Sequence, residues 1–159
     1  MTYLIDGNNY IGFTSSFNRK DPRSKYELVS KLLVFQQLKR TRVILVFDGV
    51  PDLNLLDERF QRKNFSVVFP PSGQNADSII KEIILKQTDL RRFFVVSSDR
   101  EIKNFAKAKR AHALSSKDFD RELKTKLREY KRHLQNEKRV SSPSPLEMNQ
   151  WLEIFNNKK

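Results

Sequence analysis

Short apolar runs alternate with longer amphipathic stretches along this chain, and three of the runs are followed closely by an aspartate. The runs cover residues 3–5, 43–47 and 93–96, and the aspartates are Asp6, Asp48 and Asp99. Runs of aromatic and β-branched residues without polar positions are typical of strands that are covered on both faces. Strands that alternate with helices favour right-handed crossovers and a parallel sheet. The sequence therefore predicts a three-layer, Rossmann-like α/β domain with a mainly parallel central sheet.

The stretches between the runs predict helices. Asp21 and Pro22 mark a helix start, with Asp as the N-cap and Pro in the first turn. This helix is expected to bury one face, made of Leu28, Leu32, Phe35 and Leu38. The segment after Asp6 is interpreted as a loop that contains Tyr10, Phe13 and Phe17.

A second half of the domain follows the same pattern. We expect a third strand at residues 65–69, a helix at 76–86 and a short edge strand at 111–114. Ser98 is expected to cap the helix that follows the strand at 93–96, with Glu101 as its capping-box partner.

A long basic helix is predicted at residues 117–136. Its apolar positions recur at helical spacing and form one stripe of Phe119, Leu123, Leu127, Tyr130 and Leu134. Residues 103–139 hold 13 lysines and arginines against 5 acidic residues. We expect residues 1–139 to form one domain with this helix as its basic extension. Residues 140–159 are expected to form a Ser/Pro linker and an amphipathic helix packed on the same domain.

The formal net charge of +12 points to a polyanionic partner, because each phosphate neutralised by a basic group releases condensed counterions. The chain has no cysteine, which excludes disulfides and thiolate metal sites. Its first residues show no basic segment followed by an apolar stretch, and its longest apolar run, at 43–47, is far short of a membrane span. We therefore expect a cytoplasmic protein with no membrane partner.

Four aspartates are predicted to meet at one edge of the sheet. Asp6, Asp48 and Asp99 follow strands, and Asp77 lies in the first turn of the helix after the third strand. The functional crevice of an open parallel sheet lies beyond the carboxyl ends of its strands. Each aspartate alone also fits a turn or helix-cap role, but gathered carboxylates repel one another unless a cation joins them. Oxygen ligands favour Mg²⁺ or Mn²⁺ over zinc.

Other phosphate-binding signatures are absent, including the P-loop and the dinucleotide-binding glycine motif. The ordered motifs Asp6-Gly7-Asn8-Asn9, Val46-Phe47-Asp48, Asn75-Ala76-Asp77-Ser78 and Val96-Ser97-Ser98-Asp99 resemble those of the NYN branch of the PIN-like nucleases, in particular the YacP-type bacterial proteins. The resemblance covers roughly residues 3–123. It implies a Rossmann-like sheet, divalent-metal-dependent RNA cleavage and, for some relatives, a role in mRNA decay at the ribosome.

The resemblance also implies roles for single residues. Asp6, Asp77 and Asp99 match the family's metal-binding, catalytic acids, and Asp48 matches its second-strand acid, whose role varies more. Two further residues match supporting polar positions, Asn9 and Ser98. The sequence departs from its relatives at Asn8 and Asn75, which puts substrate fit in question more than activity.

Two groups of basic residues are candidate RNA contacts: Arg19, Lys20, Arg23 and Lys25 after the first motif, and Lys124, Arg128, Lys131 and Arg132 on the long helix. The first motif also holds aromatic residues that either stack RNA bases or pack on the sheet. Two functions remain open at this point. One is an endoribonuclease that acts on single-stranded RNA with Mg²⁺ or Mn²⁺. The other is a non-catalytic RNA- or ribosome-binding module that keeps the fold.

Overall fold

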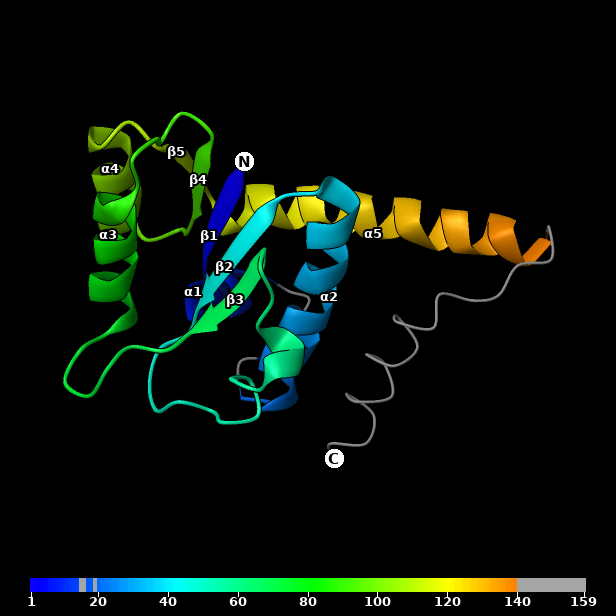
Figure 1. Ribbon diagram of the computed structural model, residues 1–159, viewed down its shortest axis with the longest axis horizontal. Coiled ribbons are helices and arrows are strands. Elements are labelled where there is room, and N and C mark those ends of the chain that lie inside the picture. The colour runs from blue at the N-terminus through cyan, green and yellow to red at the C-terminus, as the bar shows by residue number, and fades with distance from the viewer. Residues whose placement is uncertain (15–16, 19, 140–159) are drawn as a thin grey trace.

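The computed structural model describes residues 1–14, 17–18 and 20–139. Five parallel strands form one sheet in the order β3-β2-β1-β4-β5 (Figure 1). Their bounds are β1 Thr2–Asp6, β2 Arg42–Val46, β3 Phe65–Val68, β4 Phe93–Val96 and β5 His112–Leu114. The predicted parallel α/β fold is confirmed, and each expected strand is present with ends within two residues of the expectation.

Helices cover both faces of the sheet. The helix bounds are α1 Gly7–Phe13, α2 Arg23–Lys39, α3 Ala76–Lys86, α4 Arg100–Ala108 and α5 Ser116–Arg139, with a short 3₁₀ helix, η1, at Glu58–Phe60. Side chains of α1, α2 and α5 pack with one set of strand residues, and those of α3 and α4 pack with the alternate set. Successive strand residues point to opposite faces, so Leu4 joins one cluster while Tyr3 and Ile5 join the other.

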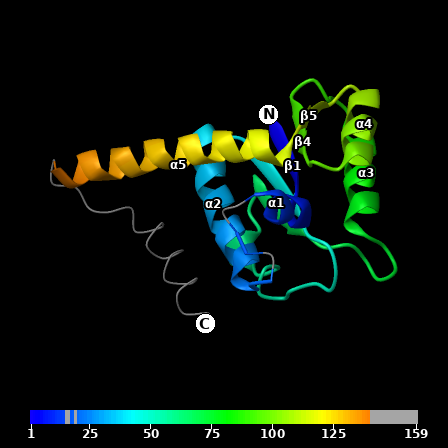
Figure 2. The same cartoon turned by 180° about the vertical axis from the view of Figure 1, so that it is seen from behind.

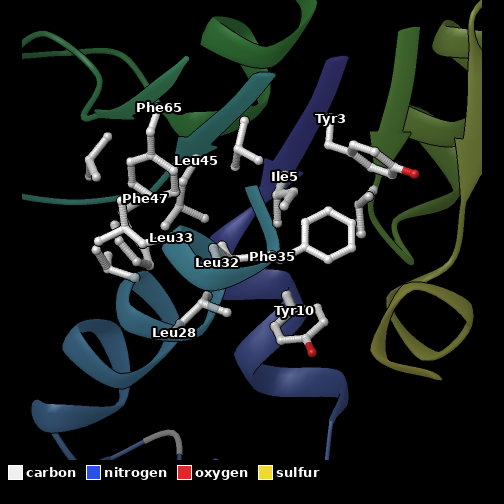
Figure 3. Close-up of a cluster of buried hydrophobic side chains, with 14 of the residues drawn as sticks. Tyr3, Ile5, Tyr10, Leu28, Leu32, Leu33, Phe35, Leu45, Phe47 and Phe65 are labelled. Atoms are coloured by element: carbon white, nitrogen blue, oxygen red, sulfur yellow. The ribbon is translucent and has the colours of Figure 1, made fainter. Parts of the chain in front are cut away.

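The larger cluster is rich in aromatic rings (Figure 3). Tyr3 lies within 5.6 Å of both Phe35 of α2 and Phe119 of α5, measured between ring centroids. Tyr10 of α1 packs edge-on against Phe119 at 5.8 Å. These contacts fasten α2 and α5 to β1 through Tyr3, and α1 to α5 through Tyr10.

Two local expectations were wrong. The segment after Asp6 is the helix α1 and not a loop, and it buries Tyr10 completely against the sheet. Leu38 is 38% exposed, whereas the other three residues of the expected face, Leu28, Leu32 and Phe35, are fully buried. Tyr10 is thus a packing residue, whereas Phe13 is 53% exposed.

The helix α5 begins in the core and extends past α2 (Figures 1 and 2). Phe119 and Leu123 are buried and Leu127 is partly buried against the larger cluster, as the apolar stripe predicts. The expected linker and last helix at 140–159, with Trp151, lie outside the described residues. In the part of the chain described, no helix combines the length and the apolar character that crossing a bilayer requires.

Candidate active site

The carboxyl ends of β1, β2 and β4 lie at one edge of the sheet and hold three of the predicted aspartates. Asp6 is the last residue of β1 and pairs in register with Val46 of β2. On the other side, Ile5 pairs with Val96, the last residue of β4. The residues that follow those partners lead directly to Asp48 and Asp99, so parallel register alone brings these acids to the same edge.

Asp6 is the buried member of the set, with 5% of its surface exposed. Its Oδ2 accepts a 3.1 Å hydrogen bond from the hydroxyl of Ser97, and the backbone amide of Asn9 also donates to it. Burial raises the pKa of Asp6 to about 6, and the charges of Asp77 and Asp99 act in the same direction. The two hydrogen bonds oppose this rise because they stabilise the carboxylate. The pKa of Asp6 is therefore set by burial, which raises it, and by two hydrogen bonds, which lower it.

Ser97 joins Asp6 to the loop that carries Asp99. Its fully buried hydroxyl accepts a 3.1 Å hydrogen bond from the amide of Asp99 while donating to Asp6. Asp99 caps α4, since its Oδ1 accepts from the amide of Ile102 at 3.1 Å. The prediction that Ser98 is the cap was wrong, because the Ser98 hydroxyl accepts instead from the amide of Ser116.

Asn9 ties three segments together through one oxygen. Its Oδ1 accepts from the amide of Ser98 at 2.8 Å and from the hydroxyl of Ser116 at 3.0 Å. Ser116 is fully buried and is the first residue of α5. The side-chain oxygen of Asn9 thus fixes α1, the β4–α4 loop and the start of α5 relative to one another, and so positions the segments that carry Asp6 and Asp99.

Asp48 lies on the exposed side of the same edge. Its Oδ1 accepts from the amides of Gly49 and of Ala76, at 3.0 and 3.2 Å, so it links the β2–β3 loop to the start of α3. Its own amide donates to Oδ1 of Asn8 at 2.7 Å. Asp48 therefore has an observed role in holding the loops, and one carboxylate oxygen outside these bonds.

Gly7 allows this edge to pack closely. A Cβ at this position would lie 2.6 Å from ring atoms of Phe47, closer than such atoms approach in practice. The glycine that follows Asp6 therefore lets α1 start directly against the end of β2.

Asp77 lies in the first turn of α3 and is partly buried. Its pKa is raised by burial and by the charges of Asp99 and Glu101, while Lys81 acts in the opposite direction. Asp6, Asp77 and Asp99 are thus within electrostatic range of one another. However, among residues 1–14, 17–18 and 20–139 no group of three or more acidic or histidine side chains is gathered closely enough to hold a metal ion as it stands.

This arrangement of acids is more typical of an open site for a hard cation than of a site in which side chains supply every ligand. Mg²⁺ keeps several waters and is usually bound through one or two carboxylates together with substrate phosphates. A buried carboxylate that repels two neighbouring carboxylates would gain stability from such an ion. The carboxylates at this edge are oxygen donors of the type that Mg²⁺ and Mn²⁺ prefer.

The predicted RNA contacts differ in their surroundings. On α2, the Lys25 ammonium lies 5.4 Å from the ring centroid of Phe47, whereas Arg23 is bound to Asp21 at 3.2 Å. Lys20 is exposed, and Arg19 lies outside the described residues.

The four α5 candidates are all exposed: Lys124, Arg128, Lys131 and Arg132. Lys124 also pairs with Asp120 at 2.9 Å, and that acid accepts a hydrogen bond from the buried Tyr10.

Two further residues of this network, Ser97 and Ser116, were not predicted from the sequence. Ser97 lies two residues before Asp99, and a serine at that spacing forms a turn with the amide two residues on. That pattern is visible in the sequence. The bond between Ser116 and Asn9 spans 107 positions and has no local sequence signal.

Comparisons with known proteins agree with this fold. The sequence model of the YacP-like NYN domain matches residues 3–154. The crystal structure of Rae1 (YacP) from Bacillus subtilis matches with a TM-score of 0.72 and 23% identity, over 86% of this chain and 80% of that one. A W164L mutant of Rae1 matches with a TM-score of 0.73 and 20% identity, over 96% and 98%. No curated protein matches this chain.

Proposed function

Because this chain belongs to the YacP-like NYN domain family, we propose that it is a divalent-metal-dependent endoribonuclease that acts on single-stranded RNA. The observation that carries the proposal is the buried carboxylate of Asp6, whose pKa is raised to about 6 beside the charges of Asp77 and Asp99. Ionisable groups with strongly shifted pKa values at the carboxyl edge of a parallel sheet are typical of functional sites. A purely structural role for Asp6 would not require its burial beside two other acids.

Asp6, Asp77 and Asp99 would hold the metal ion, with Asp48 at the margin. When bound, such an ion supplies an activated water and stabilises the charge that develops on the phosphate. The protein's own residues orient these acids. Ser97 fixes one oxygen of Asp6, the cap to Ile102 fixes Oδ1 of Asp99, and Asn9 holds the loops that carry them.

The net charge of the chain supports a polyanion as the substrate class. A chain with a net charge of +12 attracts phosphate backbones, and the exposed basic residues of α5 offer sequence-independent contacts to RNA. The chain's relation to the nuclease-like NYN family supports RNA as the polyanion. The cellular process that we propose for this activity is mRNA decay. Docking of the basic α5 on ribosomal RNA is the corresponding proposal for a ribosome-associated role.

A second candidate is an RNA- or ribosome-binding module that does not cut. The observation that favours it is that, within the described part of the chain, no three acidic or histidine side chains already form a metal-binding group. In that case the charge of α5 would serve binding alone, and addition of a metal ion would change neither stability nor RNA integrity.

A cleavage assay separates the two candidates. Single-stranded RNA labelled at its 5′ end would be incubated with the purified protein and Mg²⁺, Mn²⁺ or EDTA, with a circular RNA of the same sequence beside it. The proposal predicts cleavage of both RNAs with metal and of neither with EDTA. Cleavage of the linear RNA alone would point to exonuclease action, and binding without any cleavage would establish the second candidate.

A further inference from the structure

A lysine and a glutamate connect the two helices that begin at the candidate site. Lys81 lies on α3, one turn after Asp77, and Glu101 lies in the first turn of α4, two residues after Asp99. The Nζ atom of Lys81 is 2.5 Å from Oε1 of Glu101. The pair therefore lies beside two of the four acids and bridges the elements that carry them.

The position of Lys81 does not depend on Glu101 alone. The side chain of Lys81 is 28% exposed, and its ammonium also lies 5.6 Å from the ring centroid of Phe105 on α4. Packing of this kind holds the aliphatic part of a lysine while its charged end stays accessible. The side chain of Glu101, in contrast, is 71% exposed. The lysine is thus held near the acids, whereas its partner can turn into water.

The charge of Lys81 acts directly on the candidate site. It opposes the rise in the pKa of Asp77 that burial and the charges of Asp99 and Glu101 produce. The hydrogen bond from Lys81 to Glu101 raises the pKa of Lys81, and the charges of Glu101, Asp77 and Asp99 add to this rise. Since Lys81 lies one turn after Asp77 and is bonded to a residue of α4, it places a positive charge between the two helices that begin at the candidate site.

We propose that Lys81 binds a phosphate of the RNA strand at the site. Glu101 holds the Lys81 ammonium in the free protein and competes with that phosphate when RNA binds. This inference rests on the proposed function for its ligand. An ammonium offers three donors, of which Glu101 uses one. An ion pair with an exposed partner contributes little to stability, so the exchange of Glu101 for a phosphate costs little.

A pair on the same helix provides the matched control. Lys86 and Glu82 are also bonded, at 3.1 Å, but both belong to α3 and both side chains are more than half exposed. Replacing either residue by Gln removes a surface ion pair of the same type. This pair does not reach α4 and its charges have no part in the proposed phosphate contact.

The proposal predicts how the RNA affinity changes in each of four variants at Lys81 and Glu101. Lys81→Gln should weaken binding roughly tenfold at 0.1 M salt and reduce the salt slope by about one unit, as expected for one lost phosphate contact. Glu101→Gln should strengthen binding by about two- to fivefold, the range expected when an exposed ion pair no longer competes. The double variant should bind like Lys81→Gln, and Lys81→Arg should restore most of the affinity.

The experiment uses the full chain with Mg²⁺ and a fluorescent single-stranded RNA. Anisotropy titrations at several salt concentrations in an Asp99→Asn background measure affinity without cleavage, and KM and kcat are measured in the native background. Thermal unfolding of each variant shows that it is folded. We expect Lys81→Gln to raise KM and Glu101→Gln to lower it, with the Lys86 and Glu82 variants unchanged.

Two results would overturn the inference. One is a folded Lys81→Gln protein with unchanged affinity and salt slope. The other is a Glu101→Gln protein that binds RNA more weakly than the unaltered chain. If no metal supports cleavage, the proposed nuclease function fails, yet the anisotropy series still decides whether Lys81 binds phosphate.

Discussion

The hydroxyl of Ser97 donates a 3.1 Å hydrogen bond to the carboxylate of Asp6 and so joins the ends of two neighbouring strands. This bond opposes the effect of burial, which raises the pKa of Asp6 to about 6. A carboxylate must be ionised to bind a cation. The ionisation of Asp6 near neutral pH therefore depends on a residue that is not itself a proposed ligand.

Replacing Ser97 by Ala should move the acid limb of the pH–rate profile to higher pH. Without the hydroxyl, burial and the charges of Asp77 and Asp99 act with less opposition, so the pKa of Asp6 rises further. Cleavage rates measured with saturating Mn²⁺ between pH 5 and 9 test this. The exposed Ser78 provides the control, since Ser78→Ala should leave the profile in place. A Ser97→Ala profile that coincides with the native one would show that Asp6 does not limit activity at low pH.

Asp6→Asn should stabilise the metal-free protein at neutral pH while abolishing cleavage. Since burial raises the pKa of Asp6 above its unfolded value, stability from this group is complete below about pH 4 and is lost as the pH rises through about 6. An amide removes that loss. We expect a gain in the free energy of unfolding of about 1–3 kcal/mol at pH 8.

Urea unfolding of both proteins in EDTA, at pH 8 and at pH 4, measures this gain. The difference between them should shrink at pH 4, where the Asp6 carboxyl is protonated in the native chain. Added Mn²⁺ should stabilise the native protein and not the variant. An Asp6→Asn protein that is less stable than the native chain at pH 8 would mean that the carboxylate is favourably solvated where it lies.

The parallel fold was predictable from sequence because its causes are local. The unbroken run at 43–47 and the stripe on α3, with Ile79, Ile80 and Ile84, already specify a covered strand and a helix that packs on it. The convergence of Asp6 and Asp99 at one edge follows from parallel pairing of β1 with β4.

Other features depended on contacts between distant segments. The sequence of α1 does not predict a helix, because Gly7, Asn8 and Asn9 have low helix propensity. Its stability comes from Tyr10, which is buried against Phe119 of α5. The sequence shows two adjacent cap formers, Ser98 and Asp99, but not which of them caps the helix; in the structure Asp99 does.

The exposed basic residues of α5 predict a salt-dependent RNA contact. Replacing Lys124, Arg128, Lys131 and Arg132 together by Gln should weaken RNA binding uniformly across sequences. The salt slope should fall by up to about four units, on the rule of one unit for each phosphate contact. The rate at saturating RNA should stay unchanged because none of the four lies among the candidate metal ligands.

Fluorescence anisotropy with several unrelated RNAs at three or more salt concentrations gives both the affinity and the slope. An equal number of Gln substitutions on exposed basic residues elsewhere, at Arg42, Lys63, Lys107 and Arg110, controls for the change in net charge. If the two quadruple variants lose the same affinity, α5 contributes only through net charge and offers no particular path for RNA.

If the acids at this edge support cleavage of RNA, Asp99→Asn should remove that activity. Asn is close to Asp in size and still caps a helix, so the hydrogen bond to the amide of Ile102 can be kept while the charge is lost. The measurement is the single-turnover rate of RNA cleavage with Mn²⁺ for native and variant chains that share the same circular dichroism spectrum and RNA affinity. We expect a rate lower by orders of magnitude in the variant. A rate close to that of the native chain would show that Asp99 acts only as a helix cap and would contradict the proposed active site.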